Sequence, residues 1–169
     1  MMQSTRCSGC DYKRDVYFSD RVYDVGNLKF GLPVLSNLGW CFTCRQCVAV
    51  EYIPDLTQLI EELADLRRNT ECWQEENDLP NFRLVWAESR LQWRLRRKSP
   101  ARCLECGSTD IRELSNFHKS LDGKTLGEHP NCLGGGKLLL DGTGFVNYLG
   151  MTVYVAEGLQ KNVDATELG

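Results

Sequence analysis

Cysteines separated by two residues are the feature that most constrains how this chain can fold. The chain holds nine cysteines in 169 residues. A separation of two residues lets one tight turn aim both sulfurs at the same point, and two such turns can hold one metal ion. The pairs with this spacing, one of which has a histidine in the first position, are Cys7/Cys10, Cys41/Cys44, Cys44/Cys47, Cys103/Cys106 and His129/Cys132.

The environment expected for these thiols favours metal binding over disulfide bonds. Residues 1–10 are polar and do not resemble a secretory signal, so we expect a cytoplasmic protein whose thiols stay reduced. An odd number of cysteines also excludes complete disulfide pairing within one chain. No run of the sequence approaches the ~18 apolar residues of a membrane span, so we expect no membrane contact.

The spacing predicts two structural zinc sites. A structural zinc ion takes four nitrogen or sulfur ligands at the corners of a tetrahedron, so each ion needs two of the pairs. We expect pairs that follow one another along the chain to share an ion. The predicted ligands are Cys7, Cys10, Cys41 and Cys44 for the first ion, and Cys103, Cys106, His129 and Cys132 for the second.

These paired knuckles resemble the zinc-ribbon family of zinc fingers, in which two knuckles on β-hairpins hold one ion between them. The resemblance covers about residues 5–53 and 101–157, and it implies two tandem ribbons. Gly107, directly after Cys106, matches the knuckle pattern, whereas His129 replaces a cysteine. The gaps of 30 and 22 residues between paired knuckles exceed the usual 15–20, which implies inserted loops.

Cys41 and Cys47 compete as the partner of Cys44 in its knuckle. The residue after a knuckle often takes a positive φ, which a β-branched side chain resists. This position falls to Val48 if Cys47 is the ligand and to Arg45 if Cys41 is the ligand. We therefore favour Cys41, with Cys47 as a buried or spare thiol, but Cys47 remains an alternative ligand.

Two further candidate ligands lack a partner at the knuckle spacing. Cys72 lies on the polar side of its helical pattern, and we interpret it as a free thiol. His118 could replace His129 but does not have the knuckle spacing, so a surface histidine is the better interpretation.

Periodicity predicts an α+β protein in which two small β modules flank a central antiparallel helical hairpin, and the resemblance implies that both modules are zinc-ribbon-like. The predicted division is an N-terminal ribbon at 1–54, the helical hairpin at 55–99, a C-terminal ribbon at 100–157 and a flexible tail at 158–169.

The two predicted helices have different faces. Asp55 is a suitable N-cap for the first helix, whose apolar face is predicted to contain Leu56, Leu59, Ile60, Leu63 and Leu66. The second helix is expected from about Pro80 to Lys98. It has two apolar faces, one with Phe82, Trp86 and Trp93 and one with Leu84, Leu91 and Leu95, so we expect packing on both sides.

Charge is segregated between these helices. Residues 55–79 carry eight acidic and two basic groups, a net charge of −6, and residues 80–102 carry one acidic and seven basic groups, a net charge of +6. Such neighbouring segments either face each other or leave the basic one for a partner. The candidate partner-binding residues of the basic helix are Arg83, Arg90, Arg94 and Arg97.

Patterns typical of catalysis are weak. The segment from Trp40 to Cys44 is similar to a thioredoxin-like active site, but a strand-type run follows where that chemistry needs a helix. The run from Gly134 to Lys137 lacks the Ser or Thr of a phosphate loop. Two closed four-ligand sites leave no open position on the metal. We expect no catalytic residues and no enzyme activity.

Three functions remain after these exclusions. The first is a non-catalytic zinc protein that binds another protein as an adaptor, subunit or inhibitor. The second is a nucleic-acid-associated zinc-ribbon protein that uses the basic helix at 80–98. The sequence pI near 5.5 argues against the second, because nucleic-acid binders usually have a basic domain. The third is a thiol-redox protein. We favour the first.

Overall fold

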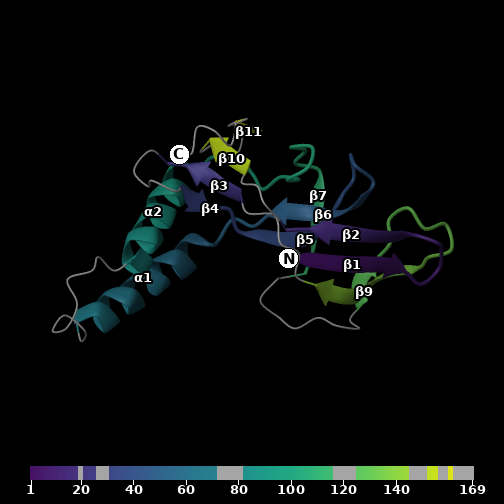
Figure 1. Ribbon diagram of the computed structural model, residues 1–169, viewed down its shortest axis with the longest axis horizontal. Helices are drawn as coiled ribbons and strands as arrows, with labels where there is room; N and C mark the ends of the chain where they lie inside the picture. The colour runs from purple at the N-terminus through teal and green to yellow at the C-terminus, as the bar shows by residue number, and fades with distance from the viewer. Residues whose placement is uncertain are drawn as a thin grey trace.

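The computed structural model describes residues 1–18, 21–25, 31–71, 82–115, 125–144, 152–155 and 160–161. It has the predicted α+β class, and the helices lie between strand-rich segments of the chain. The molecule is elongated, with the two helices at one end and most strands at the other (Figure 1). In chain order the elements are β1 (Met2–Cys7), β2 (Lys13–Tyr17), β3 (Arg21–Asp24), β4 (Leu32–Pro33), β5 (Ser36–Cys41), β6 (Gln46–Glu51), α1 (Leu56–Glu71), α2 (Phe82–Arg96), β7 (Ile111–Ser115), β8 (Thr125–Glu128), β9 (Lys137–Gly144), β10 (Thr152–Val155) and β11 (Gln160–Lys161).

The strands form three small sheets that join distant parts of the chain. Their orders are β2-β1-β9-β8, β11-β10-β3-β4 and β6-β5-β7. All pairs are antiparallel except β3 with β10, which is parallel. The pairing of β1 with β9 places Cys7 opposite Leu138, and that of β5 with β7 places Cys41 opposite Ile111. Strands from before the helices therefore pair with strands from after them.

Helix α1 begins at its predicted cap and buries part of its predicted face. The Asp55 carboxylate accepts a hydrogen bond from the Thr57 N–H at 2.8 Å, which satisfies a backbone donor in the first turn. Leu59 and Leu63 are buried, as predicted. Ile60 is 52% exposed, so the apolar face that packs on α2 is narrower than the sequence indicated.

Helix α2 buries one of its two apolar faces only in part. It packs on α1 and also touches β4. Trp93 is buried, together with the small residues Ala87 and Ser89. Phe82 and Trp86, which share a predicted face with Trp93, are exposed, so among these three residues only Trp93 is buried. No helix among the described residues is long and apolar enough to cross a membrane.

A buried ion pair joins the end of α2 to the sheets. Arg97 donates from both Nη atoms to the Glu51 carboxylate at 2.5 Å, and each side chain is only 1% exposed. Tyr23 donates its hydroxyl to the same carboxylate, and its ring stacks on Trp93 with centroids 4.6 Å apart. Such a pair costs desolvation energy, which bidentate geometry and further hydrogen bonds offset. Arg97 thus fixes how the helical hairpin meets the sheets.

Candidate metal centres

The first group of potential metal ligands, the outer cluster, joins the N-terminal strands to the connection between β8 and β9. Cys7 is the last residue of β1, and Cys10 lies in the turn that leads to β2. His129 and Cys132 lie in the connection between β8 and β9. Because β1 pairs with β9, the two turns face each other at one end of these central strands. The outer cluster consists of Cys7, Cys10, His129 and Cys132.

The second group, the inner cluster, lies between the outer ligands in the sequence. Cys41 ends β5, and Cys44 lies in the hairpin turn before β6. Cys103 forms an isolated β-bridge with Val50 of β6, and Cys106 follows in a turn that precedes β7. The inner cluster consists of Cys41, Cys44, Cys103 and Cys106.

The structure corrects the grouping predicted from chain order. Each of the eight predicted ligands lies in one of the two clusters. Cys7 and Cys10, however, meet His129 and Cys132, not Cys41 and Cys44. The physical reason is the strand pairing, because β1 pairs with β9 and β5 with β7. The clusters are therefore nested along the chain, and neither ribbon closes on an ion within its own predicted segment.

The spacing of the ligand atoms fits a metal ion and not disulfide bonds. With a Zn–S bond of about 2.3 Å, two sulfurs at tetrahedral corners lie about 3.8 Å apart, and a sulfur and a nitrogen about 3.6 Å apart. The sulfurs of Cys41 and Cys106 are 3.6 Å apart, and those of Cys44 and Cys103 are 3.9 Å apart. In the outer cluster, Cys10 Sγ lies 3.4 Å from His129 Nδ1. A disulfide would need about 2.05 Å.

Backbone N–H groups point at the cysteine sulfurs. In the outer cluster, Gly9 donates to Cys7 Sγ at 3.4 Å, and Gly136 donates to Cys132 Sγ at 3.3 Å. In the inner cluster, the Cys44 N–H donates to Cys41 Sγ at 3.4 Å, and the Glu105 N–H donates to Cys103 Sγ at 3.4 Å. These bonds favour the thiolate form, which is the form that binds metal.

Burial makes the thiolates of the inner cluster costly without a cation. It raises the pKa of the Cys103 thiol to about 11, and it also raises the pKa of Cys44, which the neighbouring cysteines raise further. A divalent cation reverses this effect because it replaces the thiol protons. In the outer cluster, the hydrogen bond from the Gly136 N–H lowers the pKa of Cys132, so this thiol ionises more readily than an ordinary cysteine.

The imidazole of His129 is held between aromatic rings. Its centroid lies 4.7 Å from that of Tyr12 and 5.0 Å from that of Trp40. Nδ1 faces Cys10, whereas Nε2 is buried without a hydrogen-bond partner among the described residues. Burial lowers the pKa of His129, which favours the neutral ring that a metal needs. Nδ1 is therefore the atom placed to bind an ion.

Two glycines allow the turns of the outer cluster to approach each other. A Cβ on Gly136 would lie 2.5 Å from Cys7 Sγ and 2.6 Å from the Gly9 nitrogen. A Cβ on Gly9 would lie 2.8 Å from Gly136 Cα. Sequence reasoning considered the glycine run before β9 only as a phosphate loop, which it rejected. The signal it missed is that a knuckle facing a second knuckle leaves no room for side chains at the contact.

The inner cluster has the knuckle that we favoured from the sequence. Cys41 and Cys44 contribute to the cluster, whereas Cys47 lies in β6 and is fully buried in the apolar core. Arg45, at the position after the knuckle, has a φ of +56°, and Gly107 has a φ of +76°. The strand β6 follows this knuckle, as predicted, where a thioredoxin-like site would have a helix.

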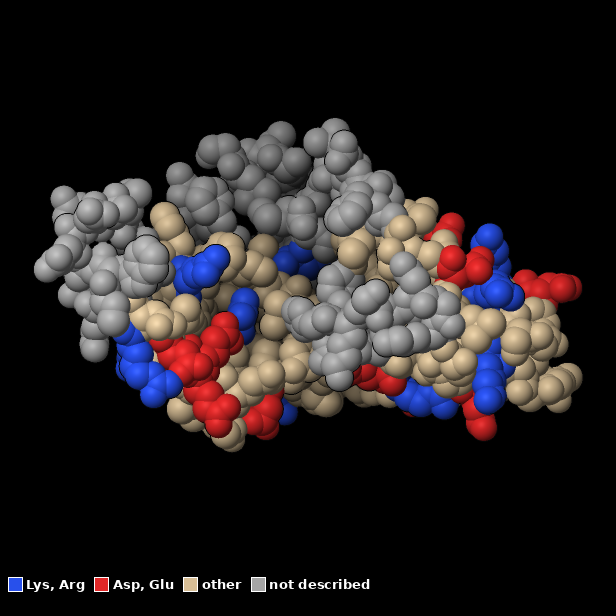
Figure 2. Space-filling view, turned by 90° about the horizontal axis from the view of Figure 1, so that it is seen from below, with Lys and Arg blue, Asp and Glu red and all other residues tan. Residues whose placement is uncertain are grey.

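The candidate arginines in and directly after α2 have different environments. Arg97 is buried against Glu51, and Arg94 Nε donates to the Pro54 carbonyl at 3.0 Å. Arg90 lies 4.0 Å from Glu62 of α1, and Arg83 is exposed. In Figure 2, acidic side chains gather at the helical end with Lys and Arg side chains beside them. The structure thus uses part of this basic charge inside the fold.

The remaining candidates from the sequence, Cys72 and His118, lie outside the described residues. The donor sets that the structure assembles are three sulfurs with one imidazole nitrogen and four sulfurs. Tetrahedral sets of this kind suit zinc, so the two clusters are consistent with two zinc sites. In comparisons with known proteins, no family model, curated protein or solved structure matches the chain.

Proposed function

We propose that the chain is a non-catalytic zinc protein in which two nested zinc-ribbon-like centres hold a surface for binding another protein. The observation that carries the proposal is the closed coordination of both clusters, each with four protein ligands. Four ligands leave a tetrahedral ion no position for water or substrate, which is the arrangement of structural sites. The metal therefore serves the fold in this proposal, and function lies on the surface that it stabilises.

Exposed apolar side chains at the knuckles support protein binding. Leu133 directly follows the ligand Cys132 and is fully exposed, and Phe42 directly follows Cys41 and is 38% exposed. Burying a side chain of this kind contributes about 1.5–3 kcal/mol. Two apolar residues held on metal-anchored turns are thus preorganised for contact with an apolar partner surface.

The charge pattern favours a protein partner over nucleic acid. Two arginines of the basic segment are engaged within the fold, Arg90 of α2 with Glu62 and Arg97, directly after α2, with Glu51. A second ion pair between the helices joins Arg67 to Glu88 at 2.9 Å. A nucleic-acid binder instead presents a continuous basic surface to phosphate groups.

Affinity capture from the native host tests this proposal. The zinc-loaded wild-type chain should capture a protein partner that survives nuclease treatment. Leu133→Ser should lose that partner, whereas Leu95→Ser, which changes another exposed leucine, on α2, should keep it. Both variants should retain two zinc ions per chain. Loss of the partner upon nuclease treatment would favour the nucleic-acid alternative, and equal capture by both variants would exclude the knuckle as the contact.

A further inference from the structure

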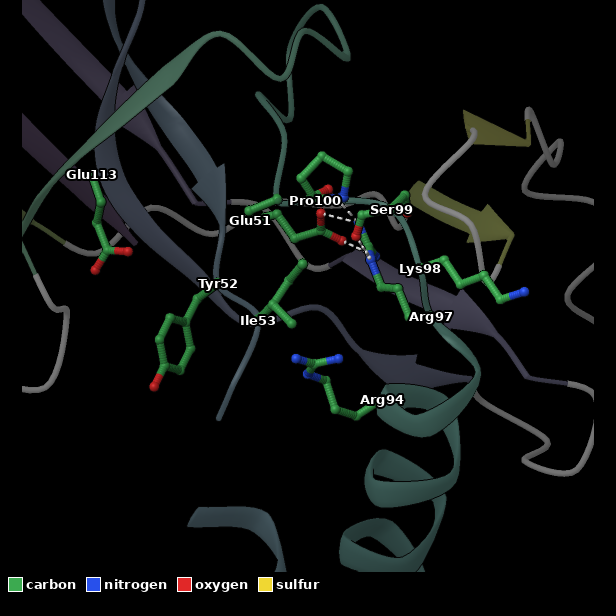
Figure 3. A pocket seen from close by; sticks show the side chains of 10 residues that line it. Glu51, Tyr52, Ile53, Arg94, Arg97, Lys98, Ser99, Pro100 and Glu113 are labelled. Atoms are coloured by element: carbon green, nitrogen blue, oxygen red, sulfur yellow. Dashed lines mark hydrogen bonds and ion pairs between the residues drawn. The ribbon is translucent and has the colours of Figure 1, made fainter. Parts of the chain in front are cut away.

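A polar cavity lies where the end of α2 meets the sheets, apart from both metal clusters (Figure 3). Its volume is about 390 Å³. This is near the lower end of the ~300–1,000 Å³ typical of small-molecule sites. Its lining includes the apolar side chains of Ile53 and Pro100. Charged side chains in the lining include those of Arg94, Glu51 and Glu113. The cavity has room for a group the size of an amino acid.

One wall of the cavity is rigid and electrically balanced. Glu51 and Arg97 form the bidentate ion pair described above, and both are buried. Arg97 also donates to the carbonyls of Ser99 and Pro100 at 3.1 Å each, so the connection after α2 is folded around its guanidinium. Since Glu51 neutralises Arg97, this pair adds little net charge to the cavity.

Arg94 supplies a positive charge that no described ion pair compensates. Its Nε donates to the Pro54 carbonyl, which fixes the orientation of the guanidinium. Within the described part of the chain, the two Nη groups have no hydrogen-bond or ion-pair partner. Figure 3 shows this guanidinium directed towards Ile53, away from the side of the view to which the Lys98 ammonium extends. The end of the guanidinium that remains open can donate two parallel hydrogen bonds to one planar anion.

We propose that this cavity binds a carboxylate group, which the two Nη groups of Arg94 hold end-on while Ile53 and Pro100 contact the apolar part of the ligand. Glu113 also lines the cavity, and its carboxylate, which accepts a hydrogen bond from Asn37 at 2.7 Å, adds negative charge that disfavours anions of higher charge. A planar, singly charged carboxylate matches the fork of the guanidinium, whereas a phosphate dianion meets repulsion from Glu113. The proposal does not depend on the partner protein proposed above.

Titrations of the zinc-loaded, ¹⁵N-labelled full chain, followed by NMR, test the site. N-acetyl-leucine should bind at least about tenfold more tightly than N-acetyl-leucinamide, because charge-assisted hydrogen bonds contribute about 1.5–3 kcal/mol. Arg94→Gln should remove this preference. Arg96→Gln should keep it, because Arg96 lies in the same turn of α2 but does not line the cavity. Equal binding of acid and amide, or equal loss in both variants, would overturn the proposal.

A second variant controls for misfolding, and a comparison of ligands identifies the source of the carboxylate. Arg94→Lys keeps the charge without the planar fork, so it should also lose the preference while its circular dichroism and zinc content stay those of wild type. An acetylated Ala-Ala-Leu peptide that binds more tightly than N-acetyl-leucine would indicate the C-terminus of a polypeptide, and the reverse order would indicate a small metabolite; both support a carboxylate site. Tighter binding of inorganic phosphate than of N-acetyl-leucine would overturn it.

Discussion

Replacing one cysteine by histidine tests the nested arrangement of the ligands, because it changes the donor set of one cluster without removing a ligand. Wild-type protein should have one ion with three sulfurs and one nitrogen, and one ion with four sulfurs. In Cys10→His, the outer cluster should change to two sulfurs and two nitrogens, while the four-sulfur ion should remain. A sulfur–nitrogen edge is only about 0.2 Å shorter than a sulfur–sulfur edge, and Cys10 is exposed, so an imidazole has room there.

Cadmium substitution followed by ¹¹³Cd NMR measures this result, because the chemical shift of the ion reports how many sulfurs bind it. Cys44→His is the matched control, and it should convert the four-sulfur signal into a second signal with three sulfurs and one nitrogen. If Cys10→His instead gave two ions with three sulfurs each, Cys10 would belong to the four-sulfur site, and the nested arrangement would be refuted.

Three other perturbations should have distinct effects. Gly136→Ala should weaken metal binding by the outer cluster and lower the free energy of unfolding by about 1–3 kcal/mol, because its Cβ would meet Cys7 Sγ at 2.5 Å. Gly134→Ala is the control: its Cβ has its nearest contact at 3.7 Å, so metal affinity and stability should stay those of wild type. Competition with a chelator measures the metal affinity of both variants. Glu51→Gln should lower the free energy of unfolding by about 3–5 kcal/mol in urea titrations, because it leaves the charge of Arg97 buried and unpaired; a loss below 1 kcal/mol would contradict this account. Lowering the pH should destabilise the fold and release metal. Burial depresses the pKa of His129 in the folded protein below its ordinary value of 6.5. The contribution of neutral His129 to stability is therefore complete above pH 6.5 and is lost as the pH falls through the depressed pKa. A melting temperature that stays constant between pH 7.5 and 5 would refute this.

The identity of the clustered side chains could be predicted from the sequence, but their grouping could not. Two residues between ligands define a single turn, so spacing offers Cys41/Cys44, Cys44/Cys47 and His129/Cys132 as knuckles, and the β-branched Val48 after Cys47 favours Cys41/Cys44. Which knuckles share an ion depends on strand pairing between residues more than one hundred positions apart, such as Cys7 and Leu138. Local spacing carries no information about such contacts.

The strand that brings the outer ligands together was also hidden from hydrophobic periodicity. β1 buries Gln3 and Thr5, two polar residues, so no apolar alternation marks it in the sequence. Thr5 compensates for burial by donating its hydroxyl to the Arg14 carbonyl at 3.1 Å. Asn37 is likewise buried in β5, and its side-chain amide donates to the Glu113 carboxylate. Buried polar residues that find partners across strands defeat predictions that rest on hydrophobicity.

Nesting of the two clusters sets an order of events during biosynthesis. The inner cluster has all its ligands once Cys106 has left the ribosome, but Cys7 and Cys10 must wait for Cys132. At about 5–20 residues per second, the 122 residues from Cys10 to Cys132 take roughly 6–24 s to synthesise. For that time the nascent chain carries two thiols without their partners, open to oxidation or to a wrong ion. Newly made protein should therefore depend on a reducing, zinc-buffered environment more than mature protein does.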